Sequence, residues 1–221
     1  MKLLCSAILK FLCGAVLVGA LLFLPAGSIN YTGGWLFMGL LFVPMFLAGI
    51  VMFIKSPDFL AKRLDVKEKQ KSQQGVIKFA GLMFVAGFVV AGLDYRFGWS
   101  VVPQAVTVAA AVFFLMAYLL YAEVMRENAY LSRTIRVEEG QKVVSTGLYG
   151  IVRHPMYMAT LVLFLVMPLV LGSWYALIPF AFYPLIIVIR LKDEEELLTR
   201  ELPGYEEYKE KVKYRLLPFI W

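Results

Sequence analysis

Four apolar stretches, each about as long as a membrane-crossing helix, constrain this chain more than any other feature. They cover residues 5–26, 31–54, 76–93 and 101–122, and a helix needs roughly 20 apolar residues to cross the hydrocarbon core of a bilayer. The chain is 61% hydrophobic and 17% charged, whereas soluble domains are about 45–50% apolar and about 25% charged. The sequence therefore predicts an integral membrane protein built from α-helices.

A fifth apolar region, residues 155–189, is too long for one membrane crossing and short for two. Gly172 lies near its middle, and prolines interrupt it at positions 168, 179 and 184. We therefore predict a hairpin of two short or tilted helices that turns near Gly172 and is bent by the prolines. The predicted fold is an all-α polytopic membrane bundle of about six crossing helices, with this C-terminal hairpin and a cytoplasmic helix after it.

The basic residues indicate how the bundle lies in the membrane, because Lys and Arg collect in cytoplasmic loops. Apart from Arg96, every basic residue beyond the first span falls in one of three segments on the same predicted side: 55–78, 126–153 and 190–215. We therefore predict a multi-pass protein with both termini cytoplasmic. This placement beside anionic lipid also explains the net charge of +6. No nucleic-acid motif is present, and we expect no nucleic-acid partner.

Four further features of the sequence exclude other classes of protein. Lys10 interrupts the first apolar run and no clear A-x-A site follows it, so we expect a retained helix rather than a cleaved signal peptide. Cys5 and Cys13 both lie in that helix and predict neither a disulfide framework nor a metal site. The single histidine has no cysteine nearby, so we predict no metal. No phosphate-binding loop or dinucleotide fingerprint indicates a soluble nucleotide fold.

Most acidic residues lie in two polar segments that flank the hairpin, residues 123–157 and 190–221. In the first segment Pro155 is placed to start a helix, which puts His154 at its N-cap beside Arg153. The positive end of a helix suits a carboxylate or another anion. The alternative, that both side chains merely reach out to the lipid surface, stays open on the sequence alone.

The second polar segment contains a carboxylate on an apolar helix face. Leu191, Leu198 and Leu202 fall on one stripe of a helix, and Glu195 occupies the same stripe. A carboxylate in that position must find a cation, a hydrogen-bond donor or water. Glu194 is less informative, because an arginine four residues earlier could pair with it as an ordinary surface ion pair.

The tyrosines that follow, Tyr205, Tyr208 and Tyr214, fit an aromatic belt that packs against the membrane surface. On the residues alone, the chain is a helical membrane protein with a candidate polar pocket on its cytoplasmic side. We expect a single integral membrane domain over residues 1–221, because no internal repeat divides it.

Three motifs in the C-terminal half carry a resemblance to a known family. They are G-x-Y-x-x-V-R-H-P-x-Y at 147–157, R-x-x-x-E-E at 190–195 and Y-x-x-Y-x-x-x-V-x-x-R-L-x-P at 205–218. In this order around an apolar hairpin, they resemble the superfamily of isoprenylcysteine carboxyl methyltransferases and phospholipid N-methyltransferases. The resemblance covers about residues 120–221 and departs from the pattern at Leu148, where many members have proline.

The resemblance implies that S-adenosylmethionine binds on the cytoplasmic side and that a lipid-like acceptor reaches it laterally from the membrane. It divides the chain into a four-helix part, 1–122, and a cofactor-binding catalytic part, 123–221. The carboxylate of S-adenosylmethionine would suit the Arg153–His154 pair, and its ribose or amine would suit the two glutamates. Its adenine would suit an aromatic cleft. The implied cofactor-binding residues are Gly147, Leu148, Tyr149, Arg153, His154, Pro155, Tyr157, Glu194 and Glu195.

The acceptor implied by the resemblance is a prenylated carboxylate or a phospholipid amine, and the two need different catalytic groups. A carboxylate is already ionised at neutral pH, and Arg190 or Arg215 would suit it. An amine must lose a proton, for which Glu195 or His154 would serve as base. The implied catalytic residues are therefore Glu195, Arg190 and Arg215.

Two alternatives to a methyltransferase stay open. A membrane reductase of the sterol type resembles the same superfamily but uses NADPH, although the chain has no K-Y-G-x-x-W-type stretch. A transporter or non-catalytic scaffold is the other alternative. Transport predicts ionisable residues inside the spans, and here these are confined to span edges, at Lys10, Lys78, Asp94 and Arg96.

Overall fold

The computed structural model of the protein describes residues 2–65, 71–132 and 134–221. Every regular element in these ranges is a helix, which confirms the all-α prediction. Four helices are long and apolar enough to cross a membrane, as the sequence predicts. They are α1 (Lys2–Ala26), α2 (Thr32–Lys55), α4 (Lys71–Phe97) and α5 (Gln104–Glu127).

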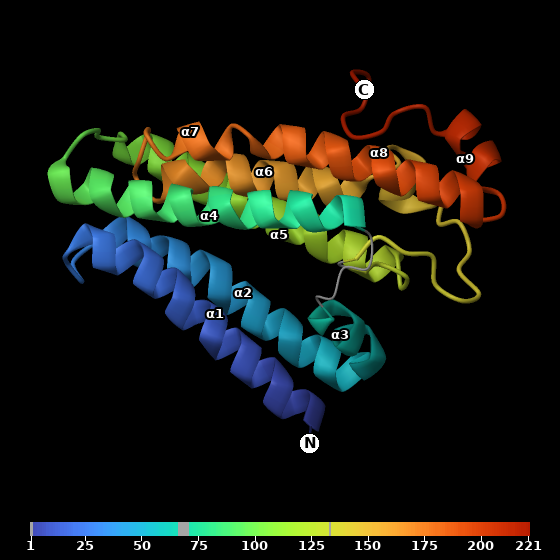
Figure 1. Cartoon of the computed structure of the whole chain (residues 1–221), viewed down its shortest axis with the longest axis horizontal. Helices are drawn as coiled ribbons and strands as arrows, with labels where there is room; N and C mark the ends of the chain where they lie inside the picture. The colour runs from blue at the N-terminus through green and yellow to red at the C-terminus, as the bar shows by residue number, and fades with distance from the viewer. Residues whose placement is uncertain (1, 66–70, 133) are drawn as a thin grey trace.

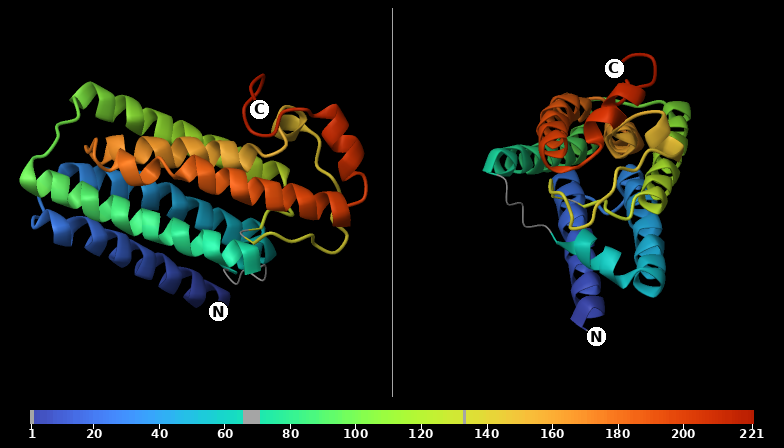
Figure 2. Two further views of the ribbon diagram at one scale, coloured as in Figure 1. Left: turned by 45° about the horizontal axis from the view of Figure 1, so that its top comes forward. Right: turned by 90° about the vertical axis from the view of Figure 1, so that its right-hand side faces the viewer.

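The fifth apolar region folds into the predicted hairpin. Its arms are α6 (Pro155–Val170) and α8 (Tyr183–Glu201), which lie side by side in Figures 1 and 2. Gly172, with a φ of +78°, lies in the turn, and a further short helix, α7 (Leu177–Phe180), follows it. With 16 residues, α6 is short for a crossing helix, and α8 is apolar only as far as residue 189.

The hairpin packs inside a group of longer helices. α6 packs mainly against α5, and α4 contacts α1, α7 and α8. Buried and partly buried aromatic rings fill the contact of α4 with the hairpin, where the Phe84 ring lies edge-on to Phe164 and Phe180 at centroid distances of 4.8 and 5.4 Å. α1 and α2 cover one side and diverge from the group towards the end where the short helix α3 (Pro57–Leu64) lies (Figure 1).

Asp94 ties the two halves of the chain together at the far end of the bundle. Its Oδ1 accepts a hydrogen bond from the Ser100 backbone N–H at 2.7 Å, and its Oδ2 accepts from the Ser100 and Ser173 hydroxyls at 2.6 and 2.5 Å. The end of α4 is thereby fixed to the turn of the hairpin. Because these bonds saturate the carboxylate, Asp94 is explained by structure rather than by a polar pathway through the membrane.

The opposite end of the bundle carries the polar elements. The polar half of α8 extends beyond the apolar helices and is followed by α9 (Tyr205–Lys211) and by residues 212–221. The right-hand view of Figure 2 looks onto this end. The segment between α5 and α6 also lies here and includes a 3₁₀ turn, η1 (Gly147–Gly150).

Candidate active site

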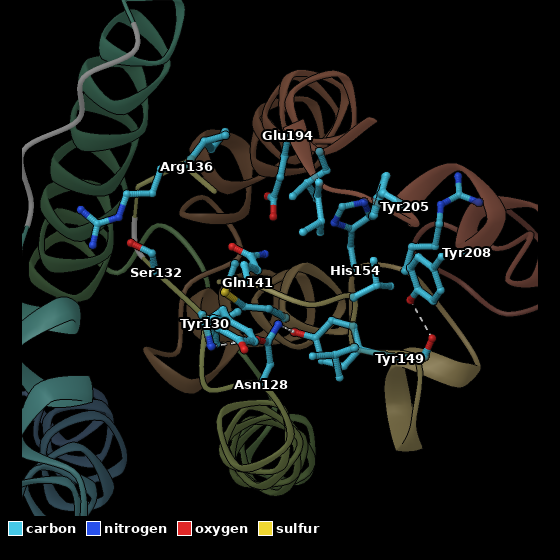
Figure 3. Close-up of a pocket in the computed structure, with 18 of the residues that line it drawn as sticks. Asn128, Tyr130, Ser132, Arg136, Gln141, Tyr149, His154, Glu194, Tyr205 and Tyr208 are labelled. Carbon is cyan, nitrogen blue, oxygen red and sulfur yellow. Dashed lines mark hydrogen bonds between the residues drawn. The ribbon is translucent and has the colours of Figure 1, made fainter. Parts of the chain in front are cut away.

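A cleft of about 800 Å³, including its solvent-open part, lies at the polar end of the bundle. One wall is formed by the loop after α5, residues 128–132 and 134–144, and the other by the start of α6, the polar half of α8 and α9 (Figure 3). Segments that are distant in sequence therefore meet here. The first and second polar segments predicted to flank the hairpin supply all of its lining.

The start of α6 places Arg153 and His154 in this cleft. Pro155 is the first residue of the helix and His154 is its N-cap, as the sequence predicts. Both side chains are buried, with 8% and 5% exposure, so they do not simply reach out to the lipid surface. The His154 ring lies 5.7 Å from the Tyr157 ring in a stacked arrangement.

Glu195 is the centre of a buried charge cluster behind the cleft. Its Oε1 accepts a hydrogen bond from Arg153 Nε at 2.6 Å and lies 3.3 Å from His154 Nε2. Its Oε2 accepts from Arg215 Nε at 2.9 Å. The carboxylate that interrupts the leucine stripe of α8 thus finds the cations that its position requires.

Residues 212–215, here called the strap, run across the start of α6 and complete the cluster. The backbone N–H groups of Arg153 and His154 donate to the carbonyls of Tyr214 and Arg215, each at 2.9 Å. Arg153 Nη1 donates to the carbonyls of Val212 and Lys213 at 2.7 and 3.1 Å. Arg153 therefore joins α6, α8 and the strap, and the orientation of the neighbouring His154 depends on all three.

The pKa of Glu195 reflects this environment. Burial alone would raise it, but hydrogen bonds from His154 and Arg153, and the charges of these groups, lower it from 4.5 to about 2. A depressed pKa means that the ionised cluster stabilises the fold fully above pH 4.5, and that this stabilisation is lost as the pH falls towards 2.

We expect the gap in unfolding temperature between wild type and Glu195→Gln to shrink as the pH falls from about 4.5 towards 2.5. The reason is that only the wild type takes up a proton at this position. Thermal unfolding of both proteins in detergent across this range measures the gap, and other carboxylates cancel in the comparison. A gap that stayed unchanged down to pH 2.5 would contradict the cluster.

A second set of hydrogen bonds shapes the cleft itself. The Tyr157 hydroxyl donates to Glu194 Oε2 at 2.5 Å. The Tyr149 hydroxyl accepts from Asn128 Nδ2 at 2.9 Å, and the Tyr149 carbonyl accepts from the Tyr208 hydroxyl at 2.7 Å (Figure 3). Glu194 is thus part of the cleft wall. The sequence alone was also consistent with an ordinary surface ion pair between Glu194 and Arg190.

The turn before α6 is held by a carboxylate from α5. Glu127 Oε2 accepts a hydrogen bond from the Leu148 backbone N–H at 3.0 Å, and Gly147 takes a left-handed φ of +53°. A Cβ added at Gly147 would overlap the Glu127 carboxylate. Only glycine therefore fits the turn that carries Tyr149 into the cleft.

The structure separates the predicted site residues into three groups. Lining the cleft are Tyr149, Arg153, His154, Tyr157, Arg190 and Glu194. Gly147, Leu148 and Pro155 build the turn and the helix start. Glu195 and Arg215 are paired with each other behind the cleft and line a shallow surface hollow on the other side of α8.

Sequence reasoning missed two parts of the cleft. The loop at 128–144 supplies polar groups such as Ser132, Thr134 and Gln141, but it has no periodicity that could mark them. The aromatic-belt prediction is wrong for Tyr205 and Tyr208, because both are buried in the cleft wall. Their spacing of three residues on α9 was the signal for a shared buried face.

Fold and site together define a helical membrane protein with a polar, enzyme-like cleft at one end of a short hairpin. Residues 105–205 match the family model for phospholipid methyltransferases. This match confirms the predicted resemblance, and the cleft is lined largely by residues inside the matched segment. Among the described residues, no group of three or more His, Cys, Asp or Glu side chains could hold a metal ion.

The chain is also similar to a curated reductase. It is 30% identical over 91 residues to the Delta(14)-sterol reductase TM7SF2 of Mus musculus, an alignment that covers 40% of this chain. The aligned stretch covers 22% of the reductase, so most of that protein has no counterpart in the alignment.

Proposed function

We propose that the protein is an S-adenosylmethionine-dependent methyltransferase that acts at the membrane on a lipid-like acceptor. The observation that carries the proposal is the convergence of the three motifs. Residues from 149–157, from 190–194 and from 205–208 come together around one cleft, and the first two groups lie inside the segment that matches the methyltransferase family.

The residues of the cleft fit the methyl donor. The Glu194 carboxylate suits the donor's ammonium group or ribose hydroxyls, and the rings of Tyr149 and Tyr157 suit a flat adenine. Leu131 and Met156 add apolar lining. When bound, the donor supplies a methyl group that its sulfonium already activates.

The protein's own contribution is then positioning and exclusion of water. His154 is placed at the cleft because it is the N-cap of α6 and because its ring lies against Glu195. Both carboxylate oxygens of Glu195 already accept hydrogen bonds, one from Arg153 and one from Arg215. We infer that Glu195 positions the site rather than contacting the donor or acting as a base. Arg190 lines the cleft at the end of the apolar part of α8, where an anionic acceptor would meet it.

The acceptor would enter from the lipid beside the hairpin. A prenylated carboxylate needs only the positive charge of Arg190, whereas a phospholipid amine needs a proton acceptor, for which His154 is placed. We also propose that the cleft and both termini face the cytoplasm, as the distribution of Lys and Arg indicates. Residues 123–221 would form the catalytic part and residues 1–122 the supporting membrane part.

The test is isothermal titration of the detergent-purified protein with S-adenosylmethionine, S-adenosylhomocysteine and NADPH. We expect the first two to bind and His154→Ala to weaken them by about tenfold or more. Arg126→Ala is the matched control, because Arg126 is exposed, pairs with Glu123 on the same helix and does not line the cleft. The affinity of this variant for both ligands should be unchanged.

Each other outcome has a definite meaning. NADPH binding without S-adenosylhomocysteine binding would favour a reductase, which the similarity to the sterol reductase makes the second candidate. Binding of none of the three would contradict both enzymes. If the donor binds, transfer of a labelled methyl group to prenylated carboxylates or to phospholipid amines distinguishes the two acceptors.

A further inference from the structure

Tyr205 is the first residue of α9 and lies in the cleft wall beside His154 (Figure 3). Gly204, with a φ of +82°, reverses the chain after α8, and the Tyr205 N–H donates to the Leu202 carbonyl at 3.2 Å. Tyr205 and Tyr208 then lie on one face of α9, with ring centroids 5.7 Å apart. The fold thus inserts two adjacent tyrosines into the same wall.

The two hydroxyl groups differ in one respect. The Tyr208 hydroxyl donates to the Tyr149 carbonyl at 2.7 Å. The Tyr205 hydroxyl is buried, and the side chain is only 4% exposed, yet it finds no hydrogen-bond partner among the described protein groups. A phenylalanine would fill the same space without burying an unpaired polar group, so the hydroxyl calls for an explanation.

One other buried side-chain atom lacks a partner in the described part of the chain, the Gln73 Oε1. Gln73 does not line the cleft, and its amide nitrogen donates to Asp193 Oδ2 at 2.5 Å. The Gln73 side chain is therefore already held by one hydrogen bond through its amide nitrogen, although its oxygen has no partner. Tyr205 is therefore the unpaired polar group that belongs to the cleft.

We propose that the Tyr205 hydroxyl binds the methyl donor, by donating a hydrogen bond to an acceptor oxygen on it, either the amino-acid carboxylate or a ribose hydroxyl. This inference rests on the proposed function. Burial, together with the charges of Glu195 and Glu194, raises the pKa of Tyr205 above its ordinary value, so the hydroxyl keeps its proton and can donate. The positive charge of the nearby Arg153 favours an electron-rich partner there.

The variant that tests this is Tyr205→Phe, with Tyr208→Phe as its matched control. Without ligand, Tyr205→Phe should leave the unfolding temperature unchanged or slightly higher, because it removes an unpaired hydroxyl. Tyr208→Phe should lower it, because the Tyr149 carbonyl loses its partner. A Tyr205→Phe protein that unfolds as early as Tyr208→Phe would indicate a structural role and overturn the proposal.

Titration with S-adenosylhomocysteine supplies the second readout. We expect Tyr205→Phe to bind it about tenfold more weakly than wild type, and equal affinity would overturn the proposal. Titration with 5′-methylthioadenosine, which lacks the amino-acid end, identifies the acceptor oxygen. A loss confined to S-adenosylhomocysteine assigns the carboxylate, and an equal loss for both ligands assigns the ribose.

These outcomes are separable from a failure of the proposed function. If the wild type binds no S-adenosylhomocysteine, the methyltransferase proposal fails and the Tyr205 inference fails with it. If the wild type binds and Tyr205→Phe binds equally well, the methyltransferase proposal stands and only the Tyr205 inference fails.

Discussion

Replacing Glu195 with alanine is expected to lower the free energy of unfolding by about 3–5 kcal/mol and to abolish donor binding. The substitution leaves Arg153, which is 8% exposed, as a buried charge without its carboxylate. It also frees Arg215 and removes the anchor of His154. Thermal unfolding in detergent and titration with S-adenosylhomocysteine measure the two effects.

The neighbouring residue provides the control. Glu194→Ala removes a carboxylate that accepts a hydrogen bond from the Tyr157 hydroxyl and that faces the cleft. It should cost only about 1 kcal/mol of stability but weaken donor binding markedly. Both variants are thus expected to lose donor binding, but only Glu195→Ala should also lose much of the stability. If Glu195→Ala were as stable as Glu194→Ala, the charge cluster would not hold the site together.

Residue patterns were sufficient to predict Glu195 as a paired carboxylate, because the leucine stripe of α8 can be recognised from helical spacing alone. They were also sufficient for the four long helices, the hairpin and Pro155 at a helix start, which depend on local composition. They could not predict which cations would pair with Glu195. That depends on the strap at 212–215, which reaches α6 through backbone hydrogen bonds that carry no side-chain signature.

The position of Tyr205 also could not be predicted from the sequence. A tyrosine near a membrane surface fits an aromatic belt, and only the chain reversal at Gly204 turns it inward. The loop at 128–144 likewise becomes part of the cleft because α5 and α6 pack together and bring it opposite α8. Such long-range placements depend on tertiary packing, so the motifs located the site while the structure decided which side chains face the ligand.

Gly147→Ala is expected to cost about 2–4 kcal/mol of stability and at least about tenfold in donor affinity. An L-residue at φ +53° is strained, and the new Cβ would push aside the Glu127 carboxylate that holds the Leu148 N–H. Tyr149 would then lose its place in the cleft. Unfolding temperature and titration with S-adenosylhomocysteine measure both effects.

Gly98→Ala separates the two causes. Gly98 has a similar φ of +61°, but an added Cβ there has no atom within 4 Å. The variant should therefore lose only about 1–2 kcal/mol of unfolding free energy, from backbone strain. It lies at the far end of the bundle and should leave donor binding unchanged. The double variant Gly147→Ala/Glu127→Ala relieves the overlap but keeps the backbone strain and the lost hydrogen bond, so it should recover part of the stability without recovering affinity. Recovery of both would mean that the turn needs space for its backbone and not the Glu127 carboxylate, and Glu127 would then have no part in placing Tyr149.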